Sequence, residues 1–126
     1  MYNVFNWVEI PVNNLEKAVK FYETILGDKC RLEEFMGMKM GFLPMGGEKE
    51  GVGGALVEAP SYKPSADGTL AYLNGGADLS VVLGKVEGAG GKIVMPKTPI
   101  GPDGEFGYIA MFIDSEGNKI GLHSIK

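Results

Sequence analysis

The chain has few of the residues on which redox, metal and nucleic-acid chemistry usually depend. Its 126 residues include one cysteine, one histidine and one tryptophan, and Arg31 is the only arginine among 12 basic residues. The lone Cys30 excludes an internal disulfide and any Cys-x-x-Cys metal or redox motif. Nucleic-acid binders usually carry basic stripes and use arginine for bidentate contacts, so a net charge of −4 indicates that nucleic acid is not a partner.

Long hydrophobic runs are also missing. No apolar stretch approaches the roughly 20 residues that a membrane-spanning helix needs, so we expect no membrane association. The segment from Met1 to Val12 has neither a basic start nor an apolar run, so we expect no signal peptide and a cytoplasmic location. A length of 126 residues fits one domain, and a hydrophobic content of 44% excludes wholesale disorder.

Glycine, by contrast, is abundant, and its positions help to delimit the elements. It accounts for 20 of the 126 residues, about twice the usual share. Apolar residues at helical spacing predict a helix over 15–26, with Asn14 as its N-cap and Gly27 as its stop. A second helix is predicted from Asp78 along the apolar stripe of residues 79–86. Strands are predicted at residues 4–12, 29–35, 38–44, 52–58, 69–73, 92–95, 106–113 and 119–124, with a loop over 96–104.

The two halves of the chain repeat each other with an offset of 64 residues and no gaps. The offset aligns helix caps, helix stops, apolar helix faces and turns, as in the pairs Asn14/Asp78, Leu15/Leu79, Gly27/Gly91, Phe42/Phe106 and Gly53/Gly117. Because the caps, stops, apolar faces and turns all align at the same offset, we predict an internal duplication. We therefore expect an α+β fold of two tandem βαβββ modules within a single domain over 1–126. Module one spans 1–58, a connector 59–68, and module two 69–126.

Two segments resemble the vicinal oxygen chelate superfamily, which contains glyoxalase I, extradiol dioxygenases, and fosfomycin- and bleomycin-resistance proteins. Residues 12–27 (VNNLEKAVKFYETILG) are similar to the family's capped helix, and residues 114–124 (DSEGNKIGLHS) to its closing turn and last strand. The resemblance implies that each module curls into half of a cup that holds a small molecule. It also implies a homodimer, with cups built within one chain or from modules of two chains.

The resemblance further identifies four positions where metal-dependent relatives carry His or Glu. They lie on the first and fourth strands of each module and correspond here to Trp7, Val57, Ala71 and Gly121. None of these side chains can bind a divalent ion, whereas a catalytic metal site needs about three protein ligands. We therefore expect neither a metal ion nor another cofactor.

Two polar residues stand two positions beyond the expected metal positions. Glu9 follows Trp7, and His123 follows Gly121, so on a strand each points to the same face as its neighbour. They form a candidate acid/base pair or polar anchors for a ligand; equally, both can be structural groups near the ends of a sheet. The candidate wall of the site, whose members can also be ordinary core, consists of Trp7, Met38, Met40, Phe42, Val57, Ala71, Leu73 and Gly121.

Three functions remain open at this point. The first is a metal-free protein that binds a small organic molecule in the cup, either to sequester it or to transform it; a cationic ligand would suit the negative net charge. The second is a metal-dependent lyase, isomerase or dioxygenase that uses displaced ligands. The third is an accessory or interaction domain with a filled cup.

Cys30 can be either a reactive thiol or a small buried hydrophobic residue. We prefer the small buried hydrophobic residue.

Overall fold

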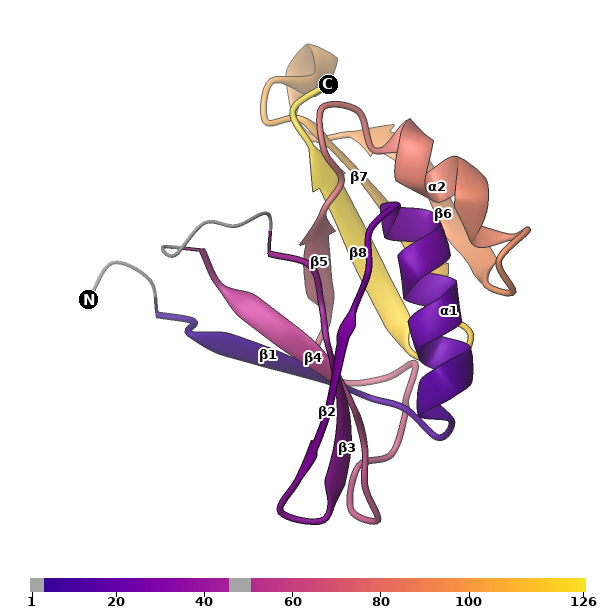
Figure 1. Cartoon of the computed structure of the whole chain (residues 1–126). Helices are drawn as coiled ribbons and strands as arrows, with labels where there is room; N and C mark the ends of the chain where they lie inside the picture. Colours follow the sequence, from indigo (N-terminus) through magenta and orange to yellow (C-terminus); the bar gives the residue numbers. More distant parts are fainter. Residues whose placement is uncertain (1–3, 46–50) are drawn as a thin grey trace.

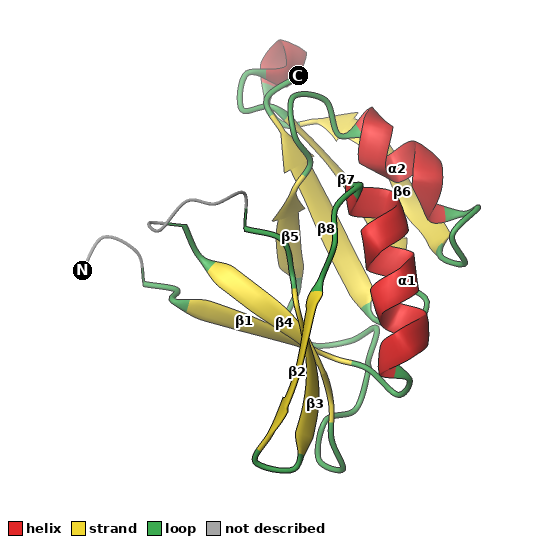
Figure 2. Ribbon diagram, in the orientation of Figure 1, coloured by secondary structure: helices red, strands yellow, loops and turns green. Residues whose placement is uncertain are grey.

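The computed structural model describes residues 4–45 and 51–126, and its architecture is the α+β fold of tandem modules that the sequence predicts. Each module contributes one four-stranded sheet and one α-helix (Figures 1 and 2). Module one consists of β1 (Trp7–Pro11), α1 (Leu15–Leu26), β2 (Arg31–Phe35), β3 (Met38–Phe42) and β4 (Gly53–Glu58). Module two consists of β5 (Ala71–Asn74), α2 (Ser80–Val86), β6 (Lys92–Pro99), the short 3-10 helix η1 (Pro102–Gly104), β7 (Tyr108–Ile113) and β8 (Lys119–Ser124).

The two sheets have the same topology. We call them sheet A, with the order β1-β4-β3-β2, and sheet B, with the order β5-β8-β7-β6. In each sheet the first and fourth strands of the module run parallel, and the remaining pairs are antiparallel. This shared and unusual order shows that the internal repeat extends to the fold.

Helix α1 has the predicted bounds because its ends are specified locally. The side chain of Asn14 accepts a hydrogen bond from the backbone N–H of Lys17, and thereby satisfies one of the free donors of the first turn. At the other end, Gly27 has a left-handed backbone with φ of 71°, and its N–H closes the helix on the carbonyl of Glu23. The predictions for the cap, the stop and the bounds 15–26 are confirmed.

Module two departs from the prediction in β6 and β5, among other places. Strand β6 continues to Pro99, where a loop from residue 96 was predicted, because register shifts between Ile93 and Thr98 accommodate Pro96 within an irregular ladder. The repeat is also not free of gaps. An offset of 64 would place Ala71 opposite Gly117, whereas Ala71 pairs with Ile120, so β5 is displaced by three residues.

One core serves both modules. Helices α1 and α2 lie side by side, in contact, on the right of Figure 1, and sheet A projects away from sheet B. The core cluster combines buried side chains of both helices and of both sheets, among them Ile10, Phe21, Leu56, Leu83, Phe112 and Leu122. The face of each sheet that meets this core is its inner face. The other, which we call the outer face, therefore points away from the core.

A polar lock joins the turn between β7 and β8 to module one. The buried hydroxyl of Tyr22 donates to Asp114 Oδ2 at 2.6 Å, and the amide of Asn118 donates both to the same oxygen and to the carbonyl of Pro11. The carboxylate of Glu116 accepts the backbone N–H groups of residues 13 and 14 at 2.9 and 2.8 Å. The turn 114–118 thus fixes the position of module two at the entrance to α1.

Candidate functional site

The outer face of sheet A carries a carboxylate with two partners. On β1, Ile10 belongs to the core and Val8 packs against it, so the alternation of a strand directs Trp7 and Glu9 to the outer face. Glu9 Oε1 accepts the hydroxyl proton of Tyr62 at 2.6 Å, and Glu9 Oε2 accepts from the indole N–H of Trp7 at 3.3 Å. The pKa of Tyr62 is raised, first because its proton is donated to this carboxylate. Glu9 is therefore oriented, with acceptor capacity to spare.

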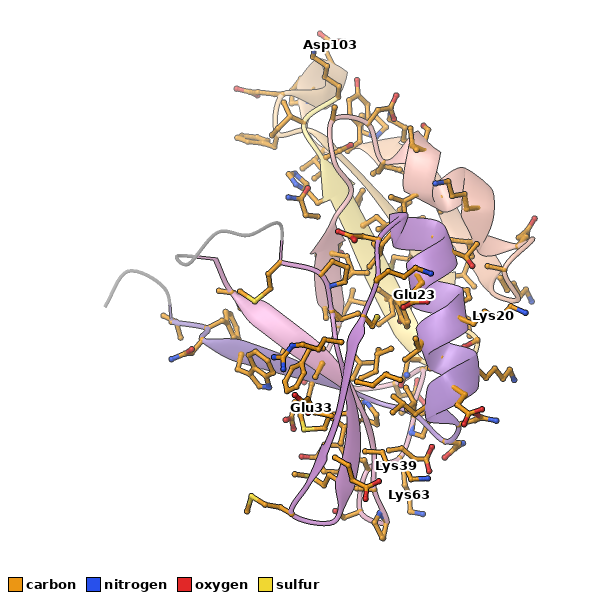
Figure 3. All side chains as sticks on the ribbon, in the orientation of Figure 1. Lys20, Glu23, Glu33, Lys39, Lys63 and Asp103 are labelled. Carbon is orange, nitrogen blue, oxygen red and sulfur yellow. The ribbon has the colours of Figure 1, made fainter. Side chains whose placement is uncertain are left out.

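An aromatic row extends from this carboxylate across the sheet. The rings of Trp7 and Phe42 meet edge to face with centroids 5.8 Å apart. The guanidinium of Arg31 lies 4.5 Å from the centroid of Phe42 and forms an ion pair of 2.8 Å with Glu33. Figure 3 shows Glu33 on the side of sheet A away from α1. The charges of Arg31 and Glu33 offset each other in this ion pair, and Glu9 adds a further negative charge to the face.

Beneath the row lies a small apolar floor. Met40 is 2% exposed and Val57 is fully buried, and together with Ala55 they form a second hydrophobic cluster. Met38, Phe42 and Tyr62 pack against this cluster while remaining partly exposed. Of the predicted wall, Trp7, Met38 and Phe42 are therefore accessible to a ligand, whereas Met40 and Val57 support them from below.

The outer face of sheet B contains His123. Ile120 and Leu122 on β8 belong to the core, so Gly121 and His123 point the other way. A cavity of about 780 Å³ adjoins this face and is lined by His123, Tyr72, Asn74 and Ile109, among others. The ring of Tyr72 covers Gly121, so closely that a Cβ there would lie 2.5 Å from a ring carbon.

The predicted placement of Ala71 and Leu73 is wrong. Ala71 pairs with Ile120 and Leu73 with Leu122, and since both partners point into the core, these side chains lie on the inner side of sheet B. The cause is the displacement of β5, which brings Tyr72 beside Gly121. Ala71 lines an apolar cavity of about 340 Å³ between the two sheets, and Leu73 lines both this cavity and the one beside His123.

Glu9 and His123 are not brought together within one chain. They occupy the outer faces of different sheets, and Glu9 does not line the cavity beside His123. The acid/base pair expected from the sequence would therefore need another arrangement of the two faces. Sequence reasoning also missed Tyr62, Tyr72 and Asn74. Tyr62 comes from the connector, whose return to sheet A leaves no periodic signal.

Cys30 does not add a nucleophile to either face. Burial is the first cause that raises the pKa of its thiol to about 11, and the neighbouring carboxylates of Glu23 and Asp28 raise it further. The thiol therefore keeps its proton near neutral pH, and the thiolate is the reactive form. This behaviour agrees with the interpretation of Cys30 as a small apolar side chain.

The doubled βαβββ topology defines a class of proteins that are built from paired modules. Comparisons with known proteins then specify the family. The model of the Glyoxalase/Bleomycin resistance protein/Dioxygenase superfamily matches residues 4–122, and the chain belongs to this superfamily. No curated protein sequence matches the chain. Among the described residues, no helix is long and apolar enough to cross a bilayer.

Solved structures share the fold at low identity. A glyoxalase I variant from Zea mays superimposes with a TM-score of 0.71 at 24% identity, over 95% of this chain and 46% of that one. The present chain thus spans about half the length of the maize enzyme. A glyoxalase/bleomycin resistance protein from Albidiferax ferrireducens superimposes with a TM-score of 0.69 at 19% identity, over 97% and 98% of the two chains. A family enzyme from Burkholderia phytofirmans reaches 0.67 at 12% identity, over 96% and 98%.

The residues present do not fit the metal site that the resemblance implies. On the outer faces, Trp7, Val57, Tyr72 and Gly121 stand at or beside the expected ligand positions, and none of them is a typical ligand of a divalent metal. In the ranges 4–45 and 51–126 no three His, Cys, Asp or Glu side chains gather closely enough to hold an ion. The donor set therefore offers no basis for a metal-dependent step.

Proposed function

We propose that the protein binds a small organic molecule between outer faces of its sheets without a metal ion, and either sequesters or transforms it. The observation that carries the proposal is the oriented carboxylate of Glu9 between Tyr62 and the half-exposed indole of Trp7. An acidic group flanked by aromatic rings favours a cationic head group with an apolar body. The site is built for recognition, because its polar group is held in place before the ligand arrives.

We further propose that a complete cup uses outer faces from two copies of the chain. Within one chain the two outer faces belong to different sheets, each packed by its inner face on the shared core, and Glu9 does not line the cavity beside His123. A second copy that supplied one of the sheets would let Glu9 on sheet A and His123 on sheet B face the same ligand. A homodimer is consistent with the unpaired edges of β1 and β5.

The alternatives receive less support. The donor set counts against a metal-dependent lyase, isomerase or dioxygenase with displaced ligands, since Glu9 and His123 lie on different sheets. The cavity of about 780 Å³ beside His123 favours ligand binding over an accessory domain with a filled cup.

A thermal-shift screen of aromatic organic cations and their neutral analogues, with and without EDTA, tests the proposal. We expect cations to raise the melting temperature of wild type regardless of EDTA, because a ligand that binds only the folded state stabilises it. The increase should be smaller in Glu9→Gln and unchanged in Glu87→Gln, which alters an exposed carboxylate at the end of α2. Stabilisation that requires an added divalent metal would favour the metal-dependent alternative, and no stabilisation at all would favour the accessory domain.

A further inference from the structure

The outer face of sheet B has a distinct recognition chemistry. Its cavity is mostly apolar, lined by Tyr72, Ile100, Ile109 and Ile125, and its polar side chains include Asn74 and His123. Hydrogen bonds already formed by these two residues determine what each can still offer to a ligand.

His123 is held in one orientation by a backbone carbonyl. Its Nε2 lies 3.1 Å from the carbonyl oxygen of Phe106, which can only accept a hydrogen bond, so Nε2 carries the proton. The neutral ring then has an unprotonated Nδ1, which is an acceptor. Within residues 4–45 and 51–126, no hydrogen bond engages this Nδ1.

The carbonyl that orients His123 belongs to a tightly cross-bonded loop. Ile100 N–H donates to the carbonyl of Gly107 at 2.8 Å, and Phe106 N–H donates back to the carbonyl of Ile100 at 3.1 Å. Gly107 has a φ of 91°, and a Cβ there would clash with the carbonyl of Ser124. The loop therefore sets the tautomer of His123 before a ligand arrives.

Asn74 supplies the complementary group. Its Oδ1 accepts the N–H of Gly76 at 2.9 Å, which fixes the orientation of the amide and leaves the NH₂ group as the donor. Asn74 pairs with His123 across the parallel strands β5 and β8, so the two side chains are neighbours on the same face. A donor and an acceptor thus stand side by side at the polar end of an apolar cavity.

We propose that this cavity recognises a neutral, planar group of the ligand that carries an acceptor and a donor next to each other on one edge, as a primary amide or a lactam does. The carbonyl of the ligand accepts from Asn74, its N–H donates to His123 Nδ1, and its apolar body packs against Ile109 and Ile125. The inference rests on the proposed function, because this face is the sheet B part of the proposed cup.

The single histidine makes the tautomer directly measurable. In a long-range ¹H–¹⁵N spectrum recorded under alkaline conditions that keep the ring neutral, we expect Nε2 to resonate as a protonated nitrogen and Nδ1 as an unprotonated one. Phe106→Ala removes an exposed ring but keeps the carbonyl, so the pattern should persist, whereas Gly107→Ala should shift it toward the tautomer mixture of a free imidazole. A mixture in wild type would overturn the inference.

Benzamide and N,N-dimethylbenzamide test the recognition. Benzamide should shift the Nδ1 resonance saturably, and the dimethyl analogue, which has no N–H, should bind at least about tenfold more weakly. Asn74→Asp keeps the oxygen bonded to Gly76 but has no NH₂, so it should fold normally and weaken benzamide to a similar extent. Equal binding of the two compounds, no binding, or unchanged affinity in Asn74→Asp would overturn the inference. Because only His123 is observed, failure here leaves the Glu9 and Trp7 tests of the proposed function independent.

Discussion

At the scale of single residues, the polar groups of this protein act mainly through fixed partners. Glu9 is oriented by Tyr62 and Trp7, and Tyr22 is buried against Asp114 in the polar lock. The first arrangement leaves acceptor capacity free at a partly exposed face. The second is entirely internal and contributes to stability.

Tyr22 gives the protein a specific dependence on alkaline pH. Burial first, and then Asp114, raise the pKa of its hydroxyl well above the ordinary value of 10.0. Above pH 10 the unfolded chain releases this proton while the folded chain keeps it, so the free energy of unfolding should fall by about 1.4 kcal/mol per pH unit for this group. Tyr22→Phe should lose that dependence and be about 1–3 kcal/mol less stable at pH 7.

Urea denaturation at pH 7 and pH 11 checks this prediction. Tyr72→Phe is the matched control, since Tyr72 is about half exposed and its hydroxyl forms no hydrogen bond with the described residues. The control should keep the wild-type stability and the wild-type pH dependence. A Tyr22→Phe protein whose stability still fell as steeply as wild type between these pH values would contradict the account.

Individual residues were predictable from the sequence when neighbours along the chain determine their role. Asn14 and Gly27 are recognisable because a helix cap and a left-handed stop need only local sequence. The partners of Glu9 were not predictable, since Tyr62 lies 53 residues away and reaches it only through the folding of the connector.

At the scale of elements, the two helices have glycine at different places: Gly27 follows the last residue of α1, and Gly84 lies within α2. Gly27 ends α1 in a left-handed conformation that a residue with a side chain adopts with strain. Gly84 lies inside α2, and a Cβ there would meet nothing within 4 Å. The same substitution should therefore have opposite effects at the two positions.

We expect Gly27→Ala to destabilise the protein by about 1 kcal/mol and Gly84→Ala to stabilise it by about 0.5–1 kcal/mol, because alanine favours a helix interior over glycine. The urea midpoints of the two variants, measured side by side with wild type, test whether the two stability changes have opposite signs. Destabilisation of both proteins would contradict the prediction, because it would mean that a Cβ at position 84 does meet a neighbour.

Strand β5 shows where element-level prediction from sequence ends. Its four residues are too few for a clear alternating pattern, so the 64-residue repeat was the best available guide. The actual register follows from the burial of Ile120 and Leu122, which places their partners Ala71 and Leu73 on the inner side. A displacement of three residues, an odd number, is sufficient to exchange the two faces.

At the scale of the whole molecule, the packing of both modules on one core is linked to the placement of Glu9 and His123 on different sheets. The common core, in which α1 and α2 are in contact, and the polar lock hold the two modules together, and the outer face of each sheet points away from this core. Family membership and fold follow from motifs and periodicity along the sequence. The spatial relation between Glu9 and His123 does not follow from the sequence, because it depends on how the two sheets are oriented.

The central claim is that the outer face of sheet A binds an organic cation through Trp7 and Glu9. The most direct measurement is a titration of the fluorescence of Trp7, the only tryptophan, with benzyltrimethylammonium. Wild type should show a saturable change, and Glu9→Gln, which keeps an acceptor for Tyr62 but loses the charge, should need about tenfold more ligand. A change that does not saturate, or equal affinity in both proteins, would contradict the account.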